Sequence, residues 1–296
     1  MIRNSLIRKK PSTQKYSFFD SFYKVYFYLC SDEKEERHKP MNIVLRSFYL
    51  IYQLCIAAPL LLALTLLTAV VTIVGSTVGN AHFWGYYPGR IWSRWCCYLF
   101  LLPVRVSCPV EVERNTSYVF VANHQGAFDI FLIYGFLGRN FKWMMKKSLR
   151  KMPFIGAACQ AAGHIFVDKS GPSKVKETIA HARKVLRGGT SLVVFPEGSR
   201  TFTGHMGFFR KGAFQLADEL QLSVVPITIN GSFDVMPRTR DLKWVIRHPL
   251  RLTIHRPIPP IGQGIDNIKN TENRSYAAIM SGLVPEYQGF EKNPDQ

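Results

Sequence analysis

The apolar stretch Tyr118-Val119-Phe120-Val121-Ala122 runs directly into the polar sequence Asn123-His124-Gln125-Gly126-Ala127-Phe128-Asp129. Short runs of β-branched and aromatic residues are typical of a buried strand. Gly126 allows a sharp turn, so that Asp129, in the first turn of a following helix, can fold back toward the ring of His124. A carboxylate that holds one imidazole nitrogen leaves the other free to accept a proton. The sequence therefore predicts a strand that ends in a general base.

A second apolar run ends in polar residues in the same way. Ser191-Leu192-Val193-Val194-Phe195 is followed by Pro196-Glu197-Gly198-Ser199-Arg200. Strand ends anchor the backbone while the loops beyond them face a cleft, so functional groups gather there. Taken alone, His124 could be an ordinary histidine at a strand end, and Glu197 and Arg200 could form a surface ion pair. The two blocks together favour a functional site.

Four ordered blocks resemble the glycerolipid acyltransferases, and most closely the 1-acylglycerol-3-phosphate (lysophosphatidic acid) acyltransferases. The two further blocks are Lys146-x-x-Leu149-x-x-x-Pro153-x-x-Gly156, with residues 163–168 after it, and the stretch 224–231. The resemblance covers residues 103–262. It implies a mainly parallel α/β sheet flanked by helices, like that of the glycerol-3-phosphate acyltransferases. It also implies transfer of a fatty acyl group from a thioester to the free sn-2 hydroxyl of lysophosphatidic acid, which gives phosphatidic acid.

The resemblance also implies roles for individual residues. His124 would remove the proton from the acceptor hydroxyl, and Asp129 would orient His124. The family commonly has Asp-Arg where this chain has Asp168-Lys169, and lysine cannot bind a phosphate through two parallel hydrogen bonds. No metal and no cofactor are implied, since the donor is acyl-CoA or an acylated acyl carrier protein. The other implied residues are Glu197, Gly198, Arg200, Lys169 and Lys211 for the acceptor phosphate, and Lys146 and Gly156 for transition-state support.

The charge of the chain indicates an anionic partner. Its 296 residues include 38 Lys and Arg but only 20 Asp and Glu, a net charge of +18. Such a balance suits nucleic acid, an anionic membrane surface or phosphorylated substrates. One cluster contains no acid and could attract anionic lipid or an acyl carrier protein, or could be an ordinary solvated face. It consists of Arg139, Lys142, Lys146, Lys147, Arg150 and Lys151.

An uncharged stretch favours a membrane over nucleic acid. No Asp, Glu, Lys or Arg lies between Arg46 and Arg90, and a helix over residues 50–74 would be about 37 Å long, enough to cross a hydrocarbon core of ~30 Å. Basic residues flank both ends, which favours both ends on the cytoplasmic side. We expect a hairpin or re-entrant anchor with the catalytic domain on the cytoplasmic side, at the inner membrane in a bacterium. The alternatives are a single crossing and a buried helical pair.

These patterns divide the chain into a basic extension (1–46), a helical anchor (47–102), a catalytic domain (103–262) and a C-terminal helix and tail (263–296). Apolar periodicity predicts helices from Pro172 to Arg187 and from Gly212 to Leu220. Seven strands are expected, at 104–112, 118–122, 142–145, 164–167, 191–195, 224–229 and 250–255.

Other functions remain as alternatives. The acceptor could be a different lysolipid or an amino-acid lipid, or the chain could be a basic membrane-binding module without catalytic activity. A serine hydrolase is disfavoured because the sequence has no Gly-x-Ser-x-Gly, and a metal hydrolase because it has no His-Glu-x-x-His. The six cysteines show no Cys-x-x-Cys spacing, so no zinc site or disulfide framework is expected.

Overall fold

The computed structural model describes residues 42–108, 112–113, 115–168, 171–186, 188–239 and 244–291. Most of the expected basic extension, residues 1–41, lies outside these ranges. Lys169 lies outside them as well, so its expected place in the phosphate site stays a prediction.

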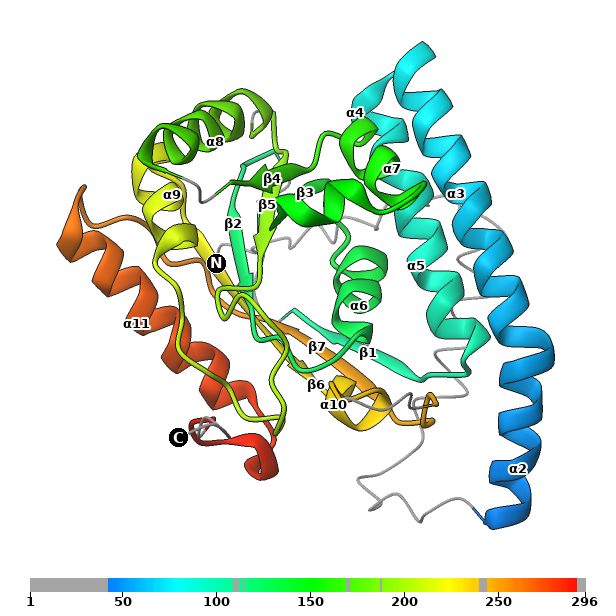
Figure 1. Cartoon of the computed structure of the whole chain (residues 1–296). Helices are drawn as coiled ribbons and strands as arrows, with labels where there is room; N and C mark the ends of the chain where they lie inside the picture. Colours follow the sequence, from blue (N-terminus) through cyan, green and yellow to red (C-terminus); the bar gives the residue numbers. More distant parts are fainter. Residues whose placement is uncertain are drawn as a thin grey trace, which may run out of the picture. The chain divides into compact units, whose positions relative to one another are not determined.

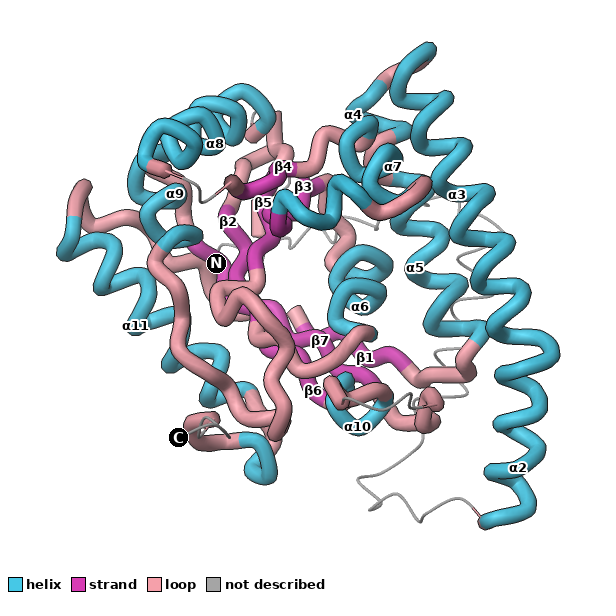
Figure 2. The backbone as a smooth tube through the Cα atoms, in the orientation of Figure 1, coloured by secondary structure: helices cyan, strands magenta, loops and turns pink. Residues whose placement is uncertain are grey.

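Within the described residues, seven strands form one sheet with the order β1-β7-β6-β2-β5-β3-β4 (Figures 1 and 2). Neighbouring strands are parallel, except that β6 and β7 are antiparallel. Each of the seven strands overlaps one of the seven predicted ranges, and the predicted fold class is confirmed. They are β1 (Val104–Ser107), β2 (Val119–Ala122), β3 (Phe141–Lys146), β4 (Ile165–Val167), β5 (Ser191–Val194), β6 (Val224–Asn230) and β7 (Leu250–Ile254).

The central strands β2, β5 and β6 are buried at every residue. Continuous apolar runs of this kind are typical of parallel strands that helices cover on both faces. The first strand is shorter than expected, because β1 ends at Ser107 rather than at Val112.

Helices lie on both sides of the sheet. In Figures 1 and 2, α8, α9 and α11 lie on one side, and α6 lies on the other. The predicted α9 has the expected bounds, and α8 ends two residues before the expected Arg187. The described helices that follow β1 are α6 (Phe128–Phe136), α7 (Ile155–Ala161), α8 (Pro172–Val185), α9 (Gly212–Leu220), α10 (Ser232–Val235) and α11 (Ile265–Gly282). Two 3₁₀ turns lie at Lys147–Lys151 and Pro285–Tyr287.

An apolar core covers one face of the sheet and packs α8, α9 and α11 against the central strands. Phe214 of α9 and Ile279 of α11 are fully buried against Val119 and Leu192. At ~25 cal/mol per Å² of apolar surface, each such side chain stabilises the fold by roughly 1.5–3 kcal/mol. This core fixes the ends of β2 and β5, where the two polar blocks begin.

A long apolar helical stretch precedes the sheet. It consists of α2 (Ile43–Tyr52), a π-helical turn at Gln53–Ala57 and α3 (Ala58–Val78). The stretch is long and apolar enough to cross a membrane. Of its most apolar segment of 18 residues, 11% is buried inside the protein.

The chain then turns back through α4 (Ala81–Trp84) and α5 (Tyr87–Leu99). Figure 1 shows α5 running beside α3, with α6 on its other side. The Trp92 indole donates to Thr65 Oγ1 at 3.0 Å, which joins α5 to α3. These two helices thus lie side by side, and the expected hairpin or re-entrant anchor stays a prediction.

Candidate active site

His124 and Asp129 form a hydrogen-bonded pair at the end of β2. His124 Nδ1 lies 2.7 Å from Asp129 Oδ2, and Asp129 is fully buried in the first turn of α6. The same oxygen accepts a hydrogen bond from the backbone N–H of Gly126 at 2.9 Å. An ionised carboxylate only accepts hydrogen bonds, so the pair places the imidazole proton on Nδ1. Nε2 makes no hydrogen bond within the described residues and is available as a base.

Gly126 is needed here for a reason that the sequence did not reveal. A Cβ atom at this position would lie 2.3 Å from the carbonyl oxygen of Ser232. The glycine therefore allows a close approach of two backbones, which also pair as an antiparallel bridge between Gly126 and Pro237. A left-handed turn is not required.

Aromatic rings fix the plane of the His124 imidazole. Phe195, the residue after β5, stacks on it with ring centroids 3.9 Å apart and planes 10° apart. Trp143 of β3 stacks in turn on Phe195 at 5.5 Å. Three adjacent strands thus contribute to one stacked column, so the ring of His124 cannot rotate freely.

The carboxylate of Glu197 is buried and accepts hydrogen bonds from two backbone N–H groups. Oε1 accepts the backbone N–H of His124 at 2.7 Å, and Oε2 accepts the N–H of Gly207 at 2.9 Å. The backbone N–H of Thr201 donates to the carbonyl of His124 at 3.0 Å. Glu197 therefore joins the two polar loops through its carboxylate, and its expected place in the phosphate site stays a prediction.

Burial raises the pKa of Glu197 to about 8, which outweighs the opposing effect of the two backbone N–H donors. The carboxylates of Asp129 and Glu291 raise it further. In the unfolded chain this carboxyl has its ordinary pKa of 4.5. The contribution of the neutral carboxyl to stability is therefore fully present below pH 4.5 and is lost as the pH rises through about 8.

We expect Glu197→Gln to gain thermal stability relative to the wild type as the pH rises from 5 to 8, because glutamine does not ionise. The measurement is the Tm of both proteins in detergent at several pH values, with Glu286→Gln, an exposed glutamate, as the control. A Tm difference that does not change with pH would show that Glu197 titrates normally.

Gly198 and Arg200 follow Glu197 in a tight loop. Gly198 has a φ of +78°, and a side chain there would also collide with Arg210, so the position favours glycine. Arg200 is half-buried, and its guanidinium has no hydrogen-bond or ion-pair partner in the described part of the chain. Lys211 is exposed at the start of α9. Within the described ranges, no hydrogen bond or ion pair joins the side chain of Lys211 to the His124 loop.

Among the described residues, no hydrogen bond or ion pair joins the side chain of Lys146, or Gly156, to the His–Asp pair. Lys146 is the exposed last residue of β3, and its neighbour Lys147 pairs with Asp168 at 2.7 Å. A Cβ atom on Gly156 would lie 2.2 Å from the carbonyl oxygen of Arg150. Packing alone therefore explains Gly156, and the expected role of both residues in transition-state support stays a prediction.

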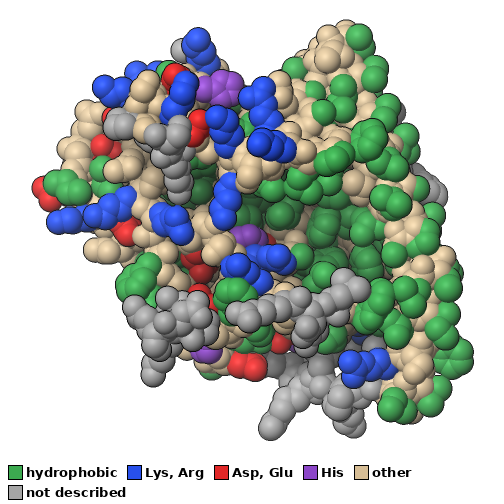
Figure 3. Space-filling model, in the orientation of Figure 1, with side chains coloured by type: hydrophobic (Ala, Val, Ile, Leu, Met, Phe, Trp, Pro, Cys, Tyr) green, Lys and Arg blue, Asp and Glu red, His purple; other side chains and the backbone are tan. Residues whose placement is uncertain are grey.

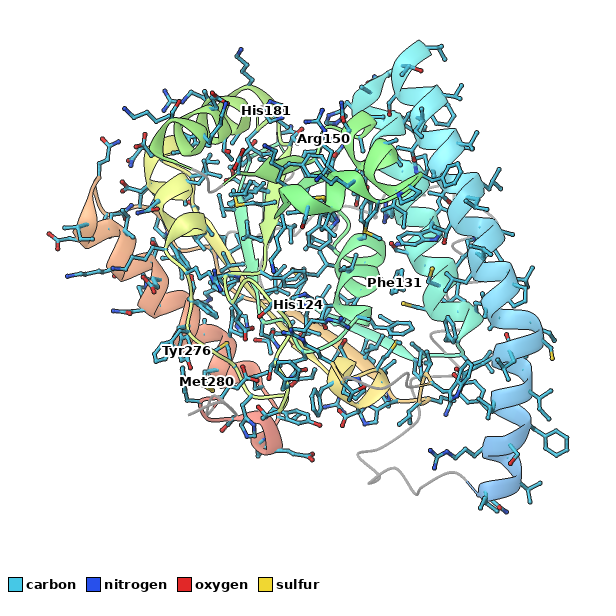
Figure 4. The ribbon with its side chains drawn as sticks, in the orientation of Figure 1. His124, Phe131, Arg150, His181, Tyr276 and Met280 are labelled. Carbon is cyan, nitrogen blue, oxygen red and sulfur yellow. The ribbon has the colours of Figure 1, made fainter. Side chains whose placement is uncertain are left out.

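The surface beside the site is hollowed and apolar. Figure 3 shows a hollow lined by hydrophobic side chains, with Lys and Arg side chains along one edge. Figure 4 places His124 at the centre of this face and Phe131 between α6 and α5. The Phe131 ring packs on Trp92 at 5.0 Å and on Phe128 at 5.2 Å. A polar base thus lies beside an apolar surface.

Comparison with known proteins agrees with this arrangement. A protein-family model described as Acyltransferase matches residues 103–230. This part of the chain is therefore similar to the acyltransferases. The resemblance drawn from the four ordered blocks is confirmed, since the matched residues contain three of the blocks and all of the fourth except Gly231.

Three relatives of this chain are named 1-acyl-sn-glycerol-3-phosphate acyltransferase. A chloroplastic one from Arabidopsis thaliana is 34% identical over 147 residues, which cover 49% of this chain and 40% of the relative. One from Chlamydomonas reinhardtii is 32% identical over 182 residues, covering 60% and 52%. The human alpha form is 31% identical over 138 residues, covering 46% and 49%. The chain therefore spans about half the length of these relatives.

The fold also matches a solved structure. The crystal structure of the 1-acyl-sn-glycerophosphate (LPA) acyltransferase PlsC from Thermotoga maritima aligns with a TM-score of 0.64 and 21% identity. The alignment covers 81% of this chain and 97% of that one. At this identity the likeness shows the fold.

Sequence reasoning missed Glu291 at the site. Its Oε1 accepts hydrogen bonds from the hydroxyl of Thr201 at 2.6 Å and from the backbone N–H of Phe202 at 2.7 Å. The C-terminal tail thereby holds the loop that follows Arg200. No local signal in the sequence indicates this contact, because the partners are about 90 residues apart.

Arg238, after α10, was also missed. Its Nη1 donates to the carbonyl of Arg200 at 2.9 Å. The bridge between Gly126 and Pro237 could not be inferred from either sequence segment alone.

Proposed function

We propose that this chain is a membrane-bound 1-acylglycerol-3-phosphate acyltransferase that makes phosphatidic acid from lysophosphatidic acid. The observation that carries the proposal is the His124–Asp129 pair with a free Nε2, held in the part of the chain that is similar to the acyltransferases, beside an apolar hollow. We take the acceptor, lysophosphatidic acid, from the names of the relatives.

The proposed reaction is a direct transfer. Nε2 of His124 takes the proton of the free sn-2 hydroxyl as the hydroxyl oxygen attacks the thioester carbonyl. The tetrahedral intermediate then expels the thiolate, which receives the proton from the imidazolium. Asp129 stabilises the imidazolium between these steps, since its Oδ2 lies 2.7 Å from Nδ1.

Arg200 is proposed to bind the acceptor phosphate. Its guanidinium is charged, half-buried and without a carboxylate partner among the described residues, and its loop is tied to the backbone of His124 by the Thr201 N–H. A phosphate on this arginine would place the glycerol hydroxyl near Nε2. Gly198 keeps the loop tight, and Glu197 fixes its position.

We expect Arg200→Lys to raise the KM for lysophosphatidic acid about 10-fold with little change in kcat. Lysine loses one of two charge-assisted hydrogen bonds, and such bonds contribute roughly 1.5–3 kcal/mol. Initial rates at varied lysolipid and fixed donor measure this, with Arg183→Lys, on the exposed face of α8, as the control. If only the KM for the acyl donor changed, Arg200 would bind the donor rather than the acceptor phosphate.

The acyl donor is proposed to be acyl-CoA or an acylated acyl carrier protein. Both carry a phosphorylated pantetheine arm, and an acyl carrier protein is acidic. The exposed side chains of Lys146, Arg150 and Lys151 would attract either donor or anionic lipid.

The helical stretch Ile43–Val78 is proposed to anchor the enzyme. The catalytic domain would face the cytoplasm, where acyl thioesters are made. In a hairpin or re-entrant arrangement the segment before the anchor would lie on the same side.

Cysteine labelling tests this arrangement in a cysteine-free variant. We expect an impermeant thiol reagent to miss cysteines placed at Ser12 and at Ser281, an exposed residue near the end of α11, until the cells are opened. Labelling at Ser12 alone in intact cells would mean a single crossing.

Complementation tests the function as a whole. The gene is expressed in a bacterial strain whose own lysophosphatidic acid acyltransferase is conditionally inactive. We expect growth and phosphatidic acid synthesis to return with the wild type but not with His124→Ala expressed at the same level. A failure of the wild type to restore either, in membranes that contain the protein, would contradict the proposal.

A further inference from the structure

Arg238 lies beside the loop of the proposed base. It follows Pro237, which pairs with Gly126 in an antiparallel bridge, and Gly126 is two residues after His124. The bridge brings the segment after α10 to the same edge of the sheet as the polar blocks after β2 and β5. Arg238 therefore belongs to the neighbourhood of the site, although it is 114 positions from His124 in the sequence.

The side chain of Arg238 is held in place by two contacts with the loop that carries Arg200. Nη1 donates to the carbonyl oxygen of Arg200 at 2.9 Å. The guanidinium carbon lies 4.1 Å from the centre of the Phe202 ring, in a cation–π arrangement. Phe202 is itself fixed, because its N–H donates to Glu291 at 2.7 Å. The position of Arg238 is thus set relative to Arg200.

Among the residues that the structure describes, no carboxylate neutralises either arginine. In the described part of the chain neither guanidinium pairs with an Asp or a Glu, and the nearby acids are engaged elsewhere. Glu291 binds Thr201 and Phe202, Glu197 binds two backbone N–H groups, and Asp234 accepts the hydroxyl of Tyr287. Arginine remains charged at any ordinary pH. Two positive charges on side chains whose segments are in contact, neither of them paired with a carboxylate, favour an anion that carries more than one negative charge.

We propose that Arg200 and Arg238 together bind a phosphate monoester as a dianion, and that Arg238 thereby selects lysolipids with a terminal phosphate. The inference rests on the proposed function and adds a second phosphate ligand from a different loop. A lysolipid whose phosphate is esterified to a head group carries one negative charge on that phosphate and offers one oxygen fewer. It would gain less from the second arginine.

The test compares two acceptors that differ by one methyl group. One is lysophosphatidic acid and the other is its phosphate monomethyl ester, which cannot become a dianion. We expect Arg238→Gln to raise the KM for lysophosphatidic acid 10- to 100-fold, and to change that for the methyl ester less than 3-fold, with kcat for both within 3-fold of the wild type. Glutamine retains an amide donor for the Arg200 carbonyl, so the loop keeps that bond.

Arg247→Gln is the matched control, since Arg247 also donates to a backbone carbonyl, that of Leu101, at 3.1 Å. It should leave both KM values unchanged. Arg238→Lys keeps the charge and should raise the KM for lysophosphatidic acid less than Arg238→Gln does, which tests the charge even if the glutamine variant fails to fold.

The pH dependence gives a second readout. The second proton of a phosphate monoester leaves near pH 6, so the wild-type KM for lysophosphatidic acid should fall as the pH rises from 5.5 to 7.5. This fall should be weaker in Arg238→Gln and absent for the methyl ester.

Two results would overturn the inference. One is an Arg238→Gln enzyme with the wild-type KM for lysophosphatidic acid. The other is an equal rise of the KM for both acceptors, which would mean that Arg238 only supports the loop. A wild-type enzyme that acylates neither acceptor would contradict the proposed function instead, so the two failures are distinguishable.

Discussion

We expect His124→Ala to lose about 100- to 10,000-fold in kcat, because a positioned base contributes that factor. The variant retains Arg200 and the apolar hollow, so its KM for lysophosphatidic acid should stay within a few-fold of the wild-type value. Turnover and KM are measured on purified protein with a labelled acyl donor. His181→Ala, an exposed histidine on α8 far from His124 in Figure 4, is the control.

The alanine variant also leaves Asp129 without its imidazole partner. A buried carboxylate that loses a partner destabilises the fold, so the Tm is measured alongside. His124→Gln offers an amide that can donate to Asp129 but cannot act as a base, and it should be as inactive as the alanine variant. Wild-type turnover by either folded variant would show that His124 is not the catalytic base.

Asp129→Asn should cost about 1,000- to 10,000-fold in kcat while the protein remains folded. Asp129 Oδ2 contacts both His124 Nδ1 and the Gly126 N–H. An amide oxygen in its place keeps both contacts but loses the negative charge that stabilises the imidazolium, whereas an amide nitrogen there would leave the Gly126 N–H without an acceptor and favour the tautomer with the proton on Nε2. That tautomer cannot accept a proton at the reacting nitrogen, and the corresponding change in serine proteases has an effect of this size.

Asp218→Asn is a suitable control for burial. Asp218 is also a buried aspartate, and it accepts hydrogen bonds from Gly264 and Asn267 on the far side of the core. Its replacement should lower the Tm without a comparable loss of turnover. If both variants lost activity in proportion to their Tm, Asp129 would have only a structural role.

The sequence predicts the sheet well because local pattern determines it. Each strand is an apolar run bounded by turn residues, and α8 and α9 show a clear helical period. The position of the site also follows, since both polar blocks begin where β2 and β5 end. The burial of these strands on both faces is what makes their sequences continuous and easy to recognise.

The orientation of individual side chains does not follow from local pattern. Glu197 turns inward because the backbone N–H of Gly207, ten residues later, offers it a hydrogen bond. Gly156 is explained by the backbone of Arg150. Arg238 and Glu291 reach the site through contacts with segments that are distant in sequence. Such contacts depend on the completed fold, so no motif reveals them.

The most direct test of the account is tandem mass spectrometry of the product made by purified protein from 1-oleoyl lysophosphatidic acid and a palmitoyl thioester, offered as palmitoyl-CoA and as palmitoyl acyl carrier protein. We expect phosphatidic acid with oleate at sn-1 and palmitate at sn-2, formed with at least one donor by the wild type and lost in His124→Ala. Palmitate released as free acid, or no phosphatidic acid with either donor, would contradict it.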